Sequence, residues 1–316
     1  MGTDTQSFPV SFPCLHQIFT ELQRAEYINP GRYPLTRCRN GHLTLRVTVQ
    51  TYPMPHWKLT VAYDGTSFNG WQVQPGLPTV QGRLAQALHH ITGETVLPQG
   101  SGRTDTGVHA LGQVVSISLD SPIPGPNLQR ALNNLLPGSI RILRIEPVPT
   151  TFHARHGARR KTYEYRISSE AICPPTLAPF VWNCTWPLEL AAMRRAASYV
   201  IGEHDFTSFA ATDPDLHTRE AENDREEGKI YSKSAIRSIF ASSWHREGSL
   251  LFYRVTGSGF LHHMVRNLVG TFVDVGRGRT PAEAIPGILE ARSRTAAGPT
   301  APPQGLFLLE VEYDPQ

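Results

Sequence analysis

The chain has 316 residues, of which 40% are apolar and 18% charged, and its formal net charge is +3. This composition is typical of a globular protein, and the absence of any run of about 18 apolar residues argues against a transmembrane helix. The first residues show no basic stretch followed by an apolar one, so we expect no signal peptide, no membrane partner and a cytoplasmic location. The four cysteines form no CxxC pair, which argues against a zinc ribbon or a redox motif.

Residues 1–55 differ in character from the rest of the chain. They contain no lysine and no sustained apolar period, although residues 14–25 are compatible with a short helix. We therefore expect residues 1–55 to be an N-terminal extension. It is either flexible or the product of a misplaced start codon, in which case Met54 is the natural initiator.

Residues 56–158 are expected to form the first half of a folded body. Residues 57–63 alternate between apolar and polar types, which predicts a half-buried strand. Thr79 is placed to cap a helix that Gly93 ends. The other elements expected here are a strand at 95–98, a strand at 113–119, a helix at 127–136 and an extended segment at 140–148.

Residues 159–316 are expected to form a similar second half. Its predicted elements are a strand from 163, a helix at 188–201, a hairpin of 234–246 and 250–256, a helix at 260–275 and a strand at 305–313. Two similar rounds of strands and helices predict an α+β body with a central cleft, where sites commonly lie. Residues 213–227 contain seven acidic residues, which is typical of a solvated, mobile loop.

A glycine-punctuated loop at residues 100–110 carries Asp105, with Arg103 two residues before it and His109 four after. The glycines allow close approach of the backbone to a ligand, and a carboxylate on a loop beside a strand is a common way to present a catalytic group. A phosphate-binding loop is a weaker interpretation, because the Lys-Ser/Thr ending is missing and a strand follows. A plain structural turn with an Arg–Asp contact stays open.

Tyr163 and Arg266 are the other residues that suggest chemistry. Tyr163 lies on a strand with basic flanks, where its ring could stack on a nucleic-acid base or simply fill the core. Arg266 lies among apolar residues, so burial would require an anionic partner such as Asp105, unless its side chain reaches solvent. Residues 155–161 carry four positive charges, either on a solvated face or against phosphates. The histidines show no HExxH-like spacing, so no metal site is expected.

Residues 102–110, GRTDTGVHA, resemble the signature loop of the TruA-type tRNA pseudouridine synthases. Further motifs agree in chain order, at residues 63–65 with 68–72, 80–81, 152–155, 163–165 and 260–270. The resemblance covers residues 57–313 and leaves out residues 1–53 and 213–229. At the start of the loop the chain has Gly100-Ser101, where the family more often has an alanine before the glycine.

The resemblance implies a pseudouridine synthase fold, in which two similar halves with flanking helices form a mixed, mostly antiparallel sheet around an active-site cleft. It also implies a homodimer that needs neither a cofactor nor a metal. The implied partner is tRNA, and the implied substrates are the uridines at positions 38–40 of its anticodon stem-loop. The reaction breaks the N1–C1′ bond, turns the base and rejoins it to the ribose through C5.

The resemblance also implies roles for particular residues. Asp105 matches the catalytic aspartate, which attacks C1′ or C6 or stabilises charge on the ribose. Arg266 would keep this carboxylate ionised and oriented, and Tyr163 would stack on the target base and move a proton. Arg103, Arg155 and His109 are expected to bind substrate, with Arg103 filling the space of the flipped base or gripping its phosphate and His109 ordering the loop.

Two other functions remain compatible with the sequence. One is an enzyme of the same fold that acts on another RNA, because the loop defines the chemistry and another surface chooses the target. The other is a non-catalytic RNA-binding module, for which a neutral residue would be expected in place of Asp105. The joint presence of Asp105, Tyr163 and Arg266 favours an enzyme.

Overall fold

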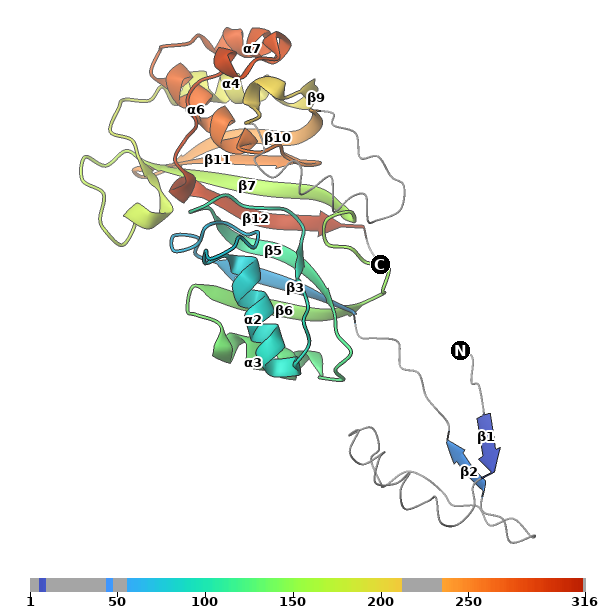
Figure 1. Ribbon diagram of the computed structural model, residues 1–316. Coiled ribbons are helices and arrows are strands. Elements are labelled where there is room, and N and C mark those ends of the chain that lie inside the picture. The colour runs from blue at the N-terminus through green and yellow to red at the C-terminus, as the bar shows by residue number, and fades with distance from the viewer. Residues whose placement is uncertain (1–5, 10–43, 48–55, 212–234, 315–316) are drawn as a thin grey trace. The chain divides into compact units, whose positions relative to one another are not determined.

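The computed structural model describes residues 6–9, 44–47, 56–211 and 235–314 (Figure 1). Contacts divide the chain into two compact units, Met1–Pro53 and Met54–Gln316. In the first unit, strand β1 (Gln6–Pro9) pairs antiparallel with β2 (Thr44–Val47). The helix expected at 14–25 and the acidic loop expected at 213–227 lie outside the described residues. No helix in the described part of the chain is long and apolar enough to cross a membrane.

The first half of the second unit follows the predicted order of elements. They are β3 (His56–Tyr63), α2 (Val80–Thr92), β4 (Gln99–Gly100), β5 (His109–Ser118), α3 (Gly125–Leu135) and β6 (Ile140–Val148). The boundaries of α2 are confirmed, because Thr79 Oγ1 accepts the Gly82 N–H and Gly93 takes the left-handed conformation. The predicted position of a strand at 95–98 is wrong, because the strand β4 lies at Gln99–Gly100, where the chain pairs with β5.

The second half contains more elements than the sequence suggests. They are β7 (Ala158–Ser168), β8 (Trp182–Asn183), α4 (Leu190–Ser198), β9 (Gly202–Asp205), β10 (Ile236–Glu247), β11 (Leu250–Gly257), α6 (Met264–Gly276), α7 (Ile285–Ala291) and β12 (Leu306–Tyr313). Single turns of 3₁₀ helix lie at Ala178–Phe180, Thr207–Phe209, Ala282–Ala284, Arg294–Ala296 and Pro303–Gly305. The predicted hairpin is confirmed, since β10 and β11 pair antiparallel up to Glu247 and Leu250.

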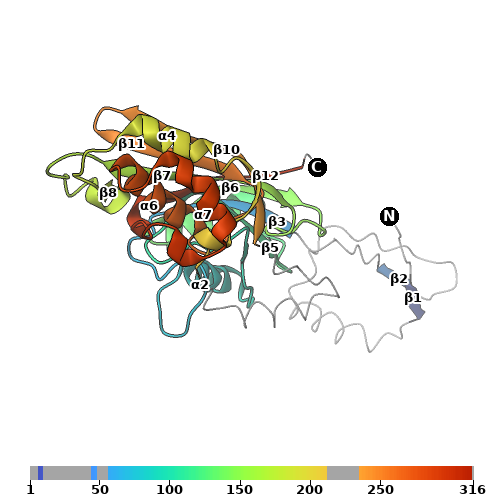
Figure 2. The same ribbon diagram turned by 90° about the horizontal axis from the view of Figure 1, so that it is seen from above.

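One mixed sheet joins the two halves, with the strand order β6-β3-β5-β12-β7-β11-β10-β9. Neighbours along this order are antiparallel except β5 and β12, which run parallel through His109–Ala110 and Phe307–Leu308. Helices α2 and α3 lie beside the strands of the first half, and α4, α6 and α7 lie beside β9–β11 (Figures 1 and 2). The predicted fold, a mixed and mostly antiparallel sheet with flanking helices, is confirmed.

The two halves repeat one arrangement of strands. In β6-β3-β5 the strand that comes first in the chain is central, and the same holds for β7 in β12-β7-β11. Because β12 lies between β5 and β7, the halves share one continuous sheet. The parallel strands β5 and β12 start at the same end of the sheet, so the loop before β5 lies beside residues of the second half.

A single apolar core supports this sheet. Leu84 and Leu88 of α2 and Leu132 of α3 are fully buried, as are Leu268 and Phe272 of α6, and all belong to one cluster. Burial of each such side chain contributes about 1.5–3 kcal/mol. The loops that begin and end at this sheet are therefore anchored on a rigid platform.

We expect a chain that starts at Met54 to fold with the thermal stability of the full-length protein and to keep its activity. The physical reason is that residues Met54–Gln316 form a compact unit with its own core. Calorimetry and an activity assay on both proteins test this expectation. A large fall in melting temperature or loss of solubility on truncation would show that residues 1–53 support the fold.

Candidate active site

The Asp105 loop is held by contacts with the end of β3 and with the segment that follows it. The Trp71 N–H donates to the Thr104 carbonyl at 3.0 Å, and the Tyr63 hydroxyl lies 2.8 Å from Thr104 Oγ1. Gly70 has φ +82°, and a Cβ placed there would lie 2.6 Å from the Thr104 carbonyl oxygen. Close approach of two backbones thus fixes the position of the residue next to Asp105.

Gly70→Ala is expected to displace this loop. The added methyl group would overlap Thr104, and the left-handed conformation itself costs an L-residue about 1–2 kcal/mol. Gly76→Ala is the matched control, because Gly76 has φ +74° but no atom within 4 Å of the added Cβ. We expect Gly70→Ala to lower both the melting temperature and the turnover, the latter by roughly 10²-fold. Equal turnover in the two variants would contradict a role for this contact in placing Asp105.

The Asp105 carboxylate and the Arg266 guanidinium meet in the structure. Arg266 Nη1 donates to Asp105 Oδ2 at 2.9 Å, and its Nε donates to the Ala301 carbonyl at 2.8 Å. The Arg266 side chain is 12% exposed and that of Asp105 is 22% exposed. The second contact fixes the plane of the guanidinium, so Arg266 presents its charge to Asp105 in one orientation.

Helix α6 begins at Met264, four residues later than the sequence predicts. His263 interrupts the predicted helix because it takes the left-handed conformation, with φ 58°. Residues 260–263 therefore form a loop, from which His262 Nε2 lies 3.6 Å from Asp105 Oδ1 and His263 Nε2 lies 3.3 Å from Asp105 Oδ2. Sequence reasoning missed both histidines as site residues, although an adjacent pair just before Arg266 was a usable signal.

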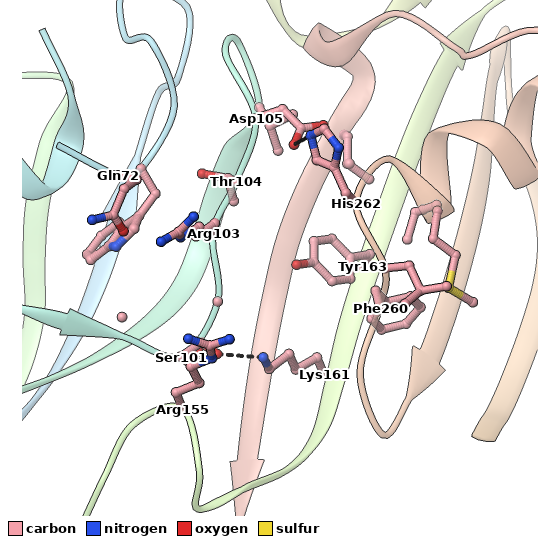
Figure 3. A pocket seen from close by; sticks show the side chains of 18 of the residues that line it. Gln72, Ser101, Arg103, Thr104, Asp105, Arg155, Lys161, Tyr163, Phe260 and His262 are labelled. Atoms are coloured by element: carbon pink, nitrogen blue, oxygen red, sulfur yellow. Dashed lines mark hydrogen bonds and ion pairs between the residues drawn. The ribbon is translucent and has the colours of Figure 1, made fainter. Parts of the chain in front are cut away.

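Tyr163 lies on the wall of the pocket beside these groups (Figure 3). Its side chain is 8% exposed and its ring meets Phe260 edge to face, with centroids 5.0 Å apart. Burial, with smaller contributions from Tyr63 and Asp105, raises the pKa of Tyr163 well above its ordinary value. The hydroxyl therefore stays protonated at neutral pH and can donate a hydrogen bond.

Basic side chains line the pocket from the neighbourhood of Thr104 to the end that lies away from Asp105 and His262 (Figure 3). They include Arg103, Arg155 and Lys161, whose Nζ donates to the Ser101 carbonyl at 2.6 Å. Burial, followed by the charges of Arg155 and Arg237, lowers the pKa of Lys161 to about 8. The sequence places Lys161 in a basic run but does not assign it to the site. The pairing of β7 with β11 and β12 decides which side chains of that run face the pocket.

His109 lies outside the pocket and is only 1% exposed. Its Nδ1 accepts the Gly65 N–H at 3.1 Å, its Nε2 lies 3.0 Å from the Pro179 carbonyl, and its ring stacks on Phe307. Burial lowers its pKa, which keeps the imidazole neutral. The structure thus gives His109 the contacts of a loop-ordering residue, and the expected contact with substrate is not available to it in this position.

The pocket has a volume of about 180 Å³ and is lined by residues from both halves of the sheet. Within the described residues, Asp105, His262 and His263 form a group whose ligand atoms lie within 4.8 Å of one another and could hold a metal ion. Arg266 already places a positive charge 2.9 Å from the same carboxylate, which opposes the binding of a cation there. The arrangement favours a carboxylate that is oriented by Arg266 rather than by a bound metal ion.

Such a carboxylate, set in a basic pocket beside a buried tyrosine, suits an enzyme that acts on RNA. The sequence profile described as tRNA pseudouridine synthase matches residues 59–156 and 196–314. The tRNA pseudouridine synthase A of Solibacter usitatus is 48% identical over 256 residues, which cover 81% of this chain and 98% of that protein. The tRNA pseudouridine synthase A of Moorella thermoacetica is 44% identical over 82% of this chain and 100% of that protein. The tRNA pseudouridine synthase A of Maridesulfovibrio salexigens is 43% identical over 82% of this chain and 91% of that protein.

The chain therefore belongs to the tRNA pseudouridine synthase family, whose members are isomerases. The matched segments contain Asp105, Arg266, Arg103, Arg155 and both histidines of the pocket. Tyr163 and Lys161 lie between the two segments, on β7.

Proposed function

We propose that this protein isomerises uridine to pseudouridine in tRNA, at positions 38–40 of the anticodon stem-loop. The observation that carries the proposal is the Asp105 carboxylate, fixed by Arg266 in a pocket that Tyr163 and basic side chains line. The family relationship supports both the reaction and the class of substrate. The choice of the three positions rests on the resemblance of the signature motifs to the TruA-type enzymes.

Asp105 performs the chemical step in this proposal. The N1–C1′ bond breaks, the base turns, and C5 bonds to C1′, while the C5 proton leaves and N1 gains a proton. An ionised carboxylate can form a covalent intermediate or stabilise the positive charge that develops on the ribose. Arg266 forms an ion pair with the carboxylate through Oδ2, which keeps the carboxylate ionised and fixes its orientation.

A base inside a stem must leave the stack before Asp105 can reach its ribose, at a cost of a few kcal/mol. The ring of Tyr163 offers a face against which the flipped base can stack, and stacking of this kind contributes about 1–3 kcal/mol per base. Arg103 and Arg155 line the same pocket, where we expect them to contact phosphates of the strand, and such contacts supply affinity without reading sequence. The pocket thus provides capture, orientation and chemistry from different side chains.

Tritium release from tRNA tests this function. A transcript with uridines at positions 38, 39 and 40 carries tritium at C5, and each isomerisation releases one tritium to water. We expect release that stops when these three uridines are replaced by cytidine, with primer extension mapping the product to the same positions. Release that persists without these uridines, or release only from an unrelated hairpin RNA, would contradict the proposed target.

We further propose that the protein acts in the cytoplasm as a homodimer, as the resemblance to the family implies. Sedimentation equilibrium is expected to give twice the 35.1 kDa mass of the chain. A mass of 35.1 kDa at the concentrations of the activity assay would contradict the dimer.

A further inference from the structure

The connection between β11 and α6 contains an unusual backbone conformation. Among the described residues other than glycine, only His263 and Arg292 have positive φ. This conformation is unfavourable for a residue with a Cβ and persists where surrounding contacts hold it, often at functional sites. Consecutive side chains of an extended segment point to opposite sides, whereas this turn lets His262 and His263 both approach Asp105.

The two carboxylate oxygens of Asp105 have different surroundings. Oδ2 lies 2.9 Å from Arg266 Nη1 and 3.3 Å from His263 Nε2. Oδ1 faces His262 Nε2 at 3.6 Å, which is too long for a hydrogen bond. Oδ2 therefore accepts a hydrogen bond from Arg266 and has His263 Nε2 close by, whereas the His262 contact of Oδ1 is longer and leaves Oδ1 more freedom to meet a ligand.

The charge on His263 follows from the groups that face it. Burial lowers its pKa, and so do His262, Arg266 and Arg294, while the charge of Asp105 opposes the shift. The net result is a lowered pKa, so the imidazole is neutral at pH 7. Arg266 thus offers Oδ2 a full positive charge, and His263 offers it a neutral N–H in the tautomer that carries the proton on Nε2.

We propose that His263 is a positioning residue for the isomerisation: together with Arg266 it anchors Oδ2 of Asp105, so that Oδ1 is presented to the flipped nucleotide. The inference rests on the proposed function of Asp105. The separation of 3.3 Å is longer than a charge-assisted hydrogen bond, and such contacts commonly tighten when substrate binds. A neutral donor fixes the orientation of the carboxylate, whereas a second full positive charge would also reduce its nucleophilicity.

Two substitutions separate the donor from the backbone turn. The amide nitrogen of glutamine can take the place of Nε2, so His263→Gln keeps a donor within reach of Asp105. Asparagine tolerates the left-handed conformation well but is too short to reach, so His263→Asn keeps the turn and removes the donor. We expect His263→Asn to lower kcat by roughly 10²-fold with an unchanged Kd for tRNA and an unchanged melting temperature. His263→Gln is expected to recover most of the lost kcat.

The outcomes distinguish this inference from the proposed function. A wild-type protein that releases no tritium from tRNA overturns the proposed function itself. An active wild type with a fully active His263→Asn variant, or with a His263→Gln variant no better than His263→Asn, overturns the role of His263 alone. A fall in melting temperature in His263→Asn together with unchanged turnover per folded molecule also overturns it.

The pH profile gives a second readout, which a purely structural role would not change. Protonation of His263 adds a second positive charge beside Oδ2, so we expect wild-type kcat to fall as the pH drops through the lowered pKa of His263, below its ordinary value of 6.5. The charged and titratable groups that face residue 263, namely Asp105, His262, Arg266 and Arg294, are the same in the wild type and in His263→Gln. The glutamine that replaces His263 has no ionisable group. His263→Gln should therefore lose this fall in kcat. An identical acid limb in the two proteins would contradict the neutral donor.

Discussion

Asp105→Asn is expected to abolish pseudouridine formation, with a loss of turnover on the order of 10⁴-fold or more. Asparagine preserves the shape of the side chain and removes its charge, so neither covalent attack nor stabilisation of a positively charged ribose remains available. The affinity for tRNA should change little, because phosphate contacts supply most of it. Tritium release under single-turnover conditions measures the chemistry, and filter binding measures the affinity.

Asp120→Asn is the matched control for this prediction. Asp120 is exposed and lies just after β5, outside the pocket, so the same change of charge there should leave turnover intact. Asp105→Asn also leaves the Arg266 charge without its partner, so a modest fall in melting temperature is expected. Turnover by the Asp105→Asn protein close to that of wild type would rule out the catalytic role.

Substitutions of Tyr163 are expected to separate stacking from proton transfer. Tyr163→Phe keeps the ring and its edge-to-face contact with Phe260, so RNA binding should persist. The raised pKa of Tyr163 keeps its hydroxyl protonated at neutral pH, where it donates a hydrogen bond and is a weak acid. If this hydroxyl moves a proton during the isomerisation, its loss should lower turnover by about 10²–10⁴-fold. Tyr163→Ala should in addition weaken capture of the flipped base by about 1–3 kcal/mol.

Three measurements on the Tyr163 variants distinguish the alternatives. If Tyr163 only fills the core, both variants lose melting temperature and neither loses turnover per folded molecule. If the ring is only a stacking platform, Tyr163→Phe turns over as wild type does and Tyr163→Ala does not. A stable and fully active Tyr163→Ala protein would remove Tyr163 from the site altogether.

Local sequence signals predicted those parts of the fold that depend on neighbouring residues. The alternation of β3 and the capping of α2 by Thr79 and Gly93 are properties of short segments, and the structure shows both. The loop around Asp105 was recognisable because its glycines and polar residues cannot serve a core. Helix α7 was missed, since its seven residues are too few to establish a helical period.

The remainder of the site depends on contacts between distant segments. The apolar period of α6 continues backwards through residues 260–263, so nothing in the local pattern signals the left-handed turn at His263. The position of Lys161 beside Ser101 follows from the register of β7 with β12 and β11. His109 is buried because Phe307 of β12 covers it, which the sequence around residue 109 does not reveal.

The position of β12 between β5 and β7 also determines when the active site can assemble during synthesis of the chain. Asp105 and Arg266 are 161 residues apart in the chain. Arg266 also donates a hydrogen bond to the carbonyl of Ala301, which lies shortly before β12. Strand β12 follows every other strand of the described sheet, so β5 and β7 emerge from the ribosome well before the strand that joins them. A nascent chain can therefore complete the three neighbouring strands β6, β3 and β5 of the first half while it still lacks a working carboxylate. Catalytic competence arrives late in synthesis, when the two halves close around β12.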